Sequence, residues 1–135
     1  MTIAVAYAGG ESSKAALRVA VAEARLRKMT LVVISTTSGR DYETPRYGGE
    51  DTLHDLELSL RATGVSFVIR QPIASDVVEG VLEEAERVRA TLLVVGLRRR
   101  SAVGKVLLGS LAQQMVLDAS MPVLAVPPAV VESHG

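Results

Sequence analysis

The residues best suited to chemistry lie in one short stretch of the chain, between Gly96 and Ser110. Three consecutive arginines, residues 98–100, follow the first glycine of this stretch, and Gly109 closes it. An apolar run at residues 92–95 precedes the stretch, and a helical pattern follows it. A buried strand, a glycine-containing turn and a helix N-terminus often bind phosphate, because main-chain N–H groups and the positive end of the helix dipole converge there. The stretch therefore predicts a site for phosphate or another anion.

Side chains for nucleophilic or metal chemistry are few. The chain has no Cys, and its two His residues, His54 and His134, lie far apart in the sequence. Thiolate catalysis and Cys-ligated metals are therefore excluded, and a His-based site would have to use His54 alone. Glu11 is the only carboxylate in the two loops that could flank a ligand, and it is better explained as a first-turn residue that complements a helix dipole. We expect no catalytic residues and no metal site, and binding of a ligand without its turnover.

Two common nucleotide motifs are missing from the sequence. A P-loop needs G-x4-G-K-[ST], but the stretch that ends at residues 104–105 has Arg99 at the first Gly position and Val106 at the Ser/Thr position. The G-x-G-x-x-G turn of dinucleotide-binding folds is also missing, since the glycine pair at residues 9–10 stands alone. The simplest phosphoryl-transfer mechanism is therefore not available to this chain.

Composition indicates one globular domain without a preference for polyanions. The chain has 135 residues, of which 48% are hydrophobic, and this is enough for a single core. Equal numbers of basic and acidic residues, 15 each, give no global field that would attract nucleic acid, and only 3% of the residues are aromatic. No apolar run approaches the roughly 18–20 residues of a membrane span, and no signal segment is recognisable. We expect a cytoplasmic protein that binds neither membrane nor nucleic acid.

Apolar runs and helical patterns alternate along the chain. Runs without polar alternation are typical of strands that are covered on both faces, and amphipathic patterns between them predict helices. The alternation predicts an α/β fold, with βα units joined by right-handed crossovers in one doubly wound domain over residues 1–128 and a short tail over residues 129–135. The predicted strands are residues 2–7, 30–36, 65–70, 92–95 and 122–126, and the four predicted helices start at Ser12 or Ser13, near Leu53, at Asp76 and near Leu111.

This architecture also predicts where a ligand lies. In doubly wound sheets, ligands bind outside the carboxyl ends of the strands, at the point where the strand order reverses. Here that point lies between the first and fourth strands. We therefore expect the loops at residues 8–12 and 96–110 to face each other across one crevice.

The spacing of Gly96, Gly109 and Ser110 matches the outer positions of the pattern G-x2-G-x9-G-[ST]. With LLVV before it and MPVLAV after it, this spacing resembles the universal stress protein family, as do the opening segment IAVAYAGGESSKAALRVA and the closing segment ASMPVLAVP. The resemblance implies a five-stranded parallel sheet in the order 3-2-1-4-5, flanked by four helices, and a homodimer that pairs its last strands antiparallel. The implied interface residues are Val123, Leu124, Ala125 and Val126.

The resemblance further implies a site for ATP or AMP, with Mg²⁺ bound only together with ATP. Adenine would lie near Ala8 and Thr36, and the phosphates near Gly96 and the helix start at residues 109–111. The chain departs from the ATP-binding members in two ways, because Ala8 replaces an aspartate at the end of the first strand and Arg99 replaces the middle glycine. The candidate nucleotide-binding residues are Ala8, Gly9, Thr36, Gly96, Arg98, Arg99, Arg100, Gly109, Ser110 and Leu111.

These departures leave two interpretations of function. The missing carboxylate at Ala8 weakens nucleotide binding by about ten- to a hundredfold, and Arg99 resists the positive-φ conformation that is open to glycine. In the first interpretation, ATP binding is weak or absent and the protein is a homodimeric, stress-linked interaction module with an unknown regulatory protein as its partner. In the second, the basic loop and helix start at residues 98–110 bind ATP, AMP or another anion. We favour the first.

Overall fold

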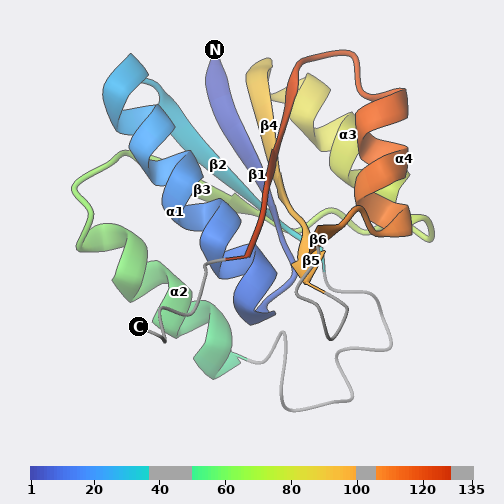
Figure 1. Ribbon diagram of the computed structural model, residues 1–135. Coiled ribbons are helices and arrows are strands. Elements are labelled where there is room, and N and C mark those ends of the chain that lie inside the picture. Colours follow the sequence, from blue (N-terminus) through green and yellow to red (C-terminus); the bar gives the residue numbers. More distant parts are fainter. Residues whose placement is uncertain (37–49, 100–105, 129–135) are drawn as a thin grey trace.

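The computed structural model describes residues 1–36, 50–99 and 106–128, and within them a parallel sheet lies between two layers of helices (Figure 1). Helices α1 and α2 cover one face of the sheet, and α3 and α4 cover the other. The elements in chain order are β1 (Thr2–Tyr7), α1 (Gly10–Arg27), β2 (Thr30–Ser35), α2 (Glu50–Arg61), β3 (Phe67–Arg70), α3 (Val77–Arg87), β4 (Ala90–Gly96), β5 (Arg98–Arg99), β6 (Val106–Leu107), α4 (Ser110–Asp118) and β7 (Val123–Val126).

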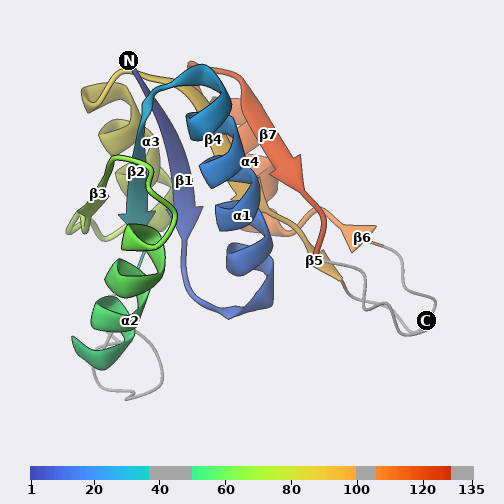
Figure 2. The same cartoon turned by 90° about the vertical axis from the view of Figure 1, so that its left-hand side faces the viewer.

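The strand order of the main sheet is β3-β2-β1-β4-β7, and all four pairings are parallel. With β7 as the fifth strand, this is the predicted order 3-2-1-4-5, so the α/β doubly wound fold is confirmed. The chain leaves β1 toward one face of the sheet, through α1, and leaves β4 toward the other face, through α4 (Figures 1 and 2). This divergence between neighbouring strands is the structural origin of a crevice at their carboxyl ends.

Both faces of the central strands are buried, as the unbroken apolar runs predict. In β1, Ile3 and Val5 pack against the layer of α1 and α2, whereas Ala4 packs against the layer of α3 and α4, and all three are completely buried. Alanines such as Ala16 and Ala20 let α1 lie close to the sheet. Because full burial of one Val or Ile side chain contributes about 1.5–3 kcal/mol, these positions give the crevice a rigid frame.

The start of α1 differs from the prediction that Ser12 or Ser13 is its N-cap. The N-cap is Gly9, and α1 already begins at Gly10. Both glycines have positive φ angles, 89° and 88°, which few other residues adopt without strain, so the glycine pair starts the helix early. At α3 the predicted cap is confirmed, because the Asp76 carboxylate accepts a hydrogen bond from the Glu79 N–H at 3.0 Å.

Residues 98–99 and 106–107 form two short strands within the stretch that the sequence predicts as a single loop. Strands β5 and β6 pair antiparallel, with Arg98 opposite Leu107 and Arg99 opposite Val106. Figure 2 shows this hairpin projecting from the carboxyl end of the sheet, next to the end of β7. In the described part of the chain, no helix is long and apolar enough to cross a membrane. The tail at residues 129–135 lies outside the described residues.

Candidate functional site

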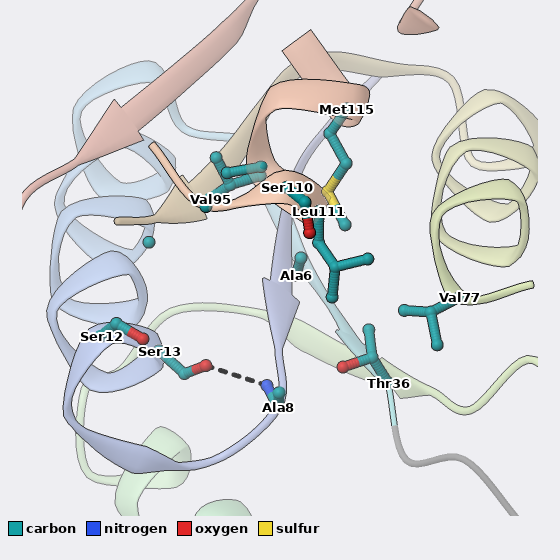
Figure 3. Close-up of a pocket in the computed structure, with 13 residues that line it drawn as sticks. Ala6, Ala8, Ser12, Ser13, Thr36, Val77, Val95, Ser110, Leu111 and Met115 are labelled. Atoms are coloured by element: carbon teal, nitrogen blue, oxygen red, sulfur yellow. Dashed lines mark hydrogen bonds between the residues drawn. The ribbon is translucent and has the colours of Figure 1, made fainter. Parts of the chain in front are cut away.

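A cavity of about 240 Å³ lies where the divergence of β1 and β4 predicts a ligand site. The β1–α1 turn borders it on one side and the first turn of α4 on another, while Thr36, which follows β2, and Val77 of α3 border it on a third (Figure 3). The two predicted loops therefore face each other across this cavity. Ligand cavities are commonly about 300–1,000 Å³, so this one is suited to a small ligand.

A side chain of α1 anchors the β1–α1 turn. The Ser13 hydroxyl is buried and accepts a hydrogen bond from the Ala8 N–H at 2.9 Å (Figure 3). Ala8 itself is exposed to the cavity and brings no polar side chain. Just after β2, the Thr36 N–H donates a hydrogen bond to the Tyr7 carbonyl at 2.9 Å. This bond holds the ends of β1 and β2 together. Burial raises the pKa of the Tyr7 hydroxyl above its usual value, so this hydroxyl stays protonated and neutral.

Gly96 allows β4 and α1 to approach each other closely at the site. A Cβ at this position would lie 2.3 Å from the Ser12 carbonyl oxygen and 2.7 Å from the Ser12 carbonyl carbon. The end of β4 therefore packs directly against the main chain of the first turn of α1, and any side chain would separate them. After Gly96, the Leu97 N–H donates to the Val126 carbonyl at 2.8 Å, which fixes the start of the hairpin against β7.

The first turn of α4 presents main-chain donors at the cavity. Its N-cap, Gly109, makes no side-chain cap hydrogen bond, and Ser110 and Leu111 border the cavity. The first turn of α1 also lacks a side-chain cap and contributes Ser12. The first N–H groups of a helix have no partner within the helix, and no side chain of the described residues caps α1 or α4. The N-terminal turns of both helices therefore bring main-chain donors to one cavity. Such an arrangement attracts a negatively charged group.

The cavity has an apolar end and a polar end. From α4, the half-exposed Leu111 side chain points toward Val77 and Thr36, with Met115 and Ala6 beside it (Figure 3). The Ser12 and Ser110 hydroxyl groups and the first turns of the two helices lie toward the other end, whereas the Thr36 hydroxyl group lies at the apolar end. An apolar group next to a phosphate group would match this division.

Charge is missing from the described lining of the cavity. All of its described side chains are apolar, hydroxyl-bearing or absent. Within the described residues there is also no group of three or more His, Asp or Glu side chains that could hold a metal ion. The described lining can therefore hold a phosphate by main-chain and hydroxyl donors, and it offers no carboxylate as a general base or as a ligand for Mg²⁺.

Most of the predicted nucleotide-binding residues lie around this cavity. Six of them line it, and Gly9, which has a positive φ, is the N-cap of α1 in the adjacent turn. Arg98 and Arg99 form β5, and Arg100 lies outside the described residues. Arg99 avoids the positive φ that arginine resists, because it is in an extended strand paired with Val106, a conformation open to any residue. The six lining residues are Ala8, Thr36, Gly96, Gly109, Ser110 and Leu111.

Sequence reasoning missed the apolar wall of the cavity and two hydroxyl groups. Val77 and Met115 belong to helix faces that point toward the sheet. From the sequence alone, such apolar residues are predicted to belong to the hydrophobic core. The sequence predicts Ser12 and Ser13 as helix caps and places Ser12 in a loop beside the crevice, but it does not identify either hydroxyl group as part of the site. The one signal that could have located them is the architecture itself, because the first turns of α1 and α4 must flank the crevice.

Known proteins are similar to this chain over nearly its whole length. The profile of the Universal stress protein family matches residues 1–127. A universal stress protein of Mycolicibacterium smegmatis is 41% identical over 126 residues, which cover 93% of this chain and 97% of that protein. Two solved structures are similar in fold. A universal stress protein from Archaeoglobus fulgidus in complex with dAMP has a TM-score of 0.67 at 22% identity, over 93% of this chain and 97% of that chain. A universal stress protein family protein from Arabidopsis thaliana with AMP bound has a TM-score of 0.65 at 19% identity, over 96% and 94% of the two chains.

Proposed function

Because this chain belongs to the universal stress protein family, we propose that its cavity binds an adenine nucleotide weakly and does not turn it over. The observation that carries the proposal is the pair of uncapped helix N-termini, of α1 and α4, at a cavity with an apolar end. Fold relatives that hold dAMP or AMP support the choice of an adenine nucleotide.

The two ends of the cavity suggest how the nucleotide would lie. The base would occupy the apolar end near Thr36, Val77 and Leu111, where apolar side chains line the cavity. The phosphate would occupy the helix start at residues 109–111, where main-chain N–H groups and the Ser110 hydroxyl can donate. A monophosphate suits the small volume and the neutral lining better than a triphosphate, whose Mg²⁺ would have to be held by phosphate and water.

We ascribe weak binding to the neutral lining. Ala8 supplies no charge-assisted hydrogen bond at the end of β1, and such a bond is worth about 1.5–3 kcal/mol. The arginines of the hairpin remain the basis of the alternative function, in which residues 98–110 supply charge for a nucleotide or another anion. Turnover is not proposed, because the described lining contains no carboxylate or imidazole that could act as a general base.

Calorimetric titration of nucleotide-stripped protein with AMP, and with ATP and Mg²⁺, tests the nucleotide proposal. We expect saturable AMP binding with a Kd of roughly 0.1 mM or weaker, since neutral donors make most of the contacts. Ser110→Ala should weaken AMP binding about three- to tenfold, which corresponds to one lost hydrogen bond. The matched control is Ser120→Ala, because Ser120 lies beyond the other end of α4 and donates to Glu86 at 2.7 Å.

Three outcomes of this titration would change the proposal. No binding of AMP or ATP up to millimolar concentration would overturn it. Low-micromolar binding that Arg99→Gly weakens strongly would favour the alternative, in which the hairpin arginines act as the anion site. Equal loss in Ser110→Ala and Ser120→Ala would mean that the phosphate does not lie at the start of α4.

We further propose that two copies of the chain pair through β7 and that the dimer acts as an interaction module with a regulatory protein. In the sheet, β7 is an edge strand that pairs with β4 on one side only (Figure 2). Val123, Leu124 and Ala125 are apolar and only partly buried within one copy. An edge strand of this kind is a ready template for pairing with another chain.

Leu124→Lys tests the dimer by light scattering coupled to size-exclusion chromatography. We expect the original protein to be a dimer and Leu124→Lys to be a monomer, because the substitution places a charge at the centre of the paired edge. Val68→Lys is the matched control, since Val68 is a partly exposed residue of β3 at the opposite edge of the sheet. A monomeric original protein, or a Leu124→Lys dimer, would place the assembly contacts elsewhere.

A further inference from the structure

Gly80 is the fourth residue of α3, and nothing in the geometry of the helix itself requires a glycine there. It is buried and does not have the positive φ of Gly9, Gly10 or Gly64. Glycine in a helix interior costs about 1 kcal/mol relative to alanine, so the absence of a side chain must serve a contact. A Cβ at Gly80 would lie 2.9 Å from the Ala74 Cβ and 3.9 Å from the Pro72 Cβ. The missing side chain is therefore the space into which the β3–α3 connection, residues 71–76, packs.

This connection lies directly behind the apolar end of the cavity. Pro72, Ala74 and Gly80 line a small hollow of about 10 Å³, whose other walls include Thr36 and Val77. Thr36 and Val77 also line the main cavity. They therefore form a thin wall that has the ligand cavity on one side and the β3–α3 connection on the other. The hollow holds at most one water, which needs about 10–15 Å³, so a displacement of the connection toward the wall would meet Thr36 and Val77.

Both ends of the connection are fixed. At its start, Arg70 forms an ion pair with the nearly buried carboxylate of Glu84 in α3, with a distance of 3.7 Å from Nε to Oε2. At its end, Asp76 caps α3 by accepting the Glu79 N–H at 3.0 Å, and its carbonyl accepts the Gly80 N–H at 3.0 Å. A displacement caused at Ala74 must therefore be taken up between residues 72 and 75, next to the wall.

We propose that Gly80 is a positioning residue for the base end of the ligand cavity. By leaving room for Ala74, it lets residues 72–75 lie against α3 and so sets the position of Thr36 and Val77. Gly80 does not touch the ligand itself. The proposal rests on the nucleotide proposal above for the identity of the ligand, but the packing that it describes exists without any ligand.

Gly80→Ala, the double variant Gly80→Ala with Ala74→Gly, and the control Glu83→Ala test the proposal by AMP titration. Gly80→Ala should weaken AMP binding about five- to tenfold, because the new methyl group displaces a main-chain segment by a few tenths of an ångström. The double variant should restore AMP binding to within about twofold of the original protein, since it removes the methyl group that clashes. Glu83→Ala changes an exposed residue of the same helix and should leave AMP binding unchanged.

Backbone amide chemical shifts of the ligand-free proteins provide a second readout that needs no nucleotide. We expect the shifts of Thr36 and residues 73–77 to change in Gly80→Ala and to return toward the original values in the double variant. If the original protein binds no AMP but these shifts behave as expected, the nucleotide proposal fails and the positioning role of Gly80 stands. If the original protein binds AMP and Gly80→Ala binds it equally well, or if the double variant does not recover, the positioning role is wrong.

Discussion

Replacing Ala8 with aspartate should tighten AMP binding by about ten- to a hundredfold. A carboxylate at the end of β1 would supply the charge-assisted hydrogen bond that the described lining of the cavity lacks, and such a bond contributes about 1.5–3 kcal/mol. Ala8 is exposed, so the new carboxylate would keep part of its hydration and would not carry the cost of a buried charge. The measurement is a calorimetric titration of both proteins with AMP at the same ionic strength.

The local structure is expected to tolerate this change. The Ser13 hydroxyl binds the main-chain N–H of Ala8 and not its side chain, so the turn keeps its anchor in the variant. A negative charge just before the N-terminus of α1 also complements the helix dipole, which stabilises the fold by about 0.3–1 kcal/mol. An increase in Tm without an increase in affinity would show that the carboxylate turns toward α1 and away from the ligand.

Ala8→Asn is the matched control for charge. It has nearly the same shape as Ala8→Asp but makes only neutral hydrogen bonds, which are worth about half as much as charge-assisted ones. AMP affinity should therefore increase in the order Ala8, Asn, Asp. Equal affinity in all three proteins would contradict the assignment of the end of β1 to the nucleoside part of the ligand.

The sequence predicts the frame of this molecule better than its loops, for physical reasons. Unbroken apolar runs such as residues 92–95 identify strands because burial on both faces dominates their energy. The β5–β6 hairpin has no such signal, since two-residue strands are too short for any alternation to appear. The sequence predicts too late a start for α1, because Ser12 and Ser13 are good caps in isolation, whereas Gly9 and Gly10 have positive φ angles and begin the helix earlier.

The candidate site was predictable where it depends on topology and hidden where it depends on packing. Gly96, Gly109 and Ser110 have a recognisable spacing, and the structure places all three around the cavity. Met115 and Gly80 carry no such spacing, because a methionine that faces the sheet reads as core and a helical glycine reads as a weak helix former. Distances between residues 74 and 80, or between 12 and 96, cannot be inferred from the pattern of a single sequence.

The largest loss of stability is expected from Gly96→Ala. The added methyl group would lie 2.3 Å from the carbonyl oxygen of Ser12 and 2.7 Å from its carbonyl carbon, both main-chain atoms that cannot rotate away. Relief requires a movement of the first turn of α1 away from β4, although Ala15, Ala16 and Val94 are tightly packed nearby. Overpacking of this kind costs about 1–3 kcal/mol and occasionally more. We expect about 3 kcal/mol here, measured as the change in the free energy of unfolding by urea denaturation.

Gly109→Ala separates this effect from the general cost of replacing a glycine at the site. Gly109 also lines the cavity, but its φ of −64° is open to any residue, and a Cβ there would meet no atom within 4 Å. The loss of stability should be about 1 kcal/mol or less, because alanine is only a poorer N-cap than glycine. Equal losses in the two variants would contradict the close approach of β4 to α1. If Gly96→Ala alone is strongly destabilised, the first glycine of the spacing is required by the contact between strand and helix, whether or not a nucleotide binds. A match to that glycine then supports the fold, and binding has to be judged from Ala8, Ser110 and the start of α4.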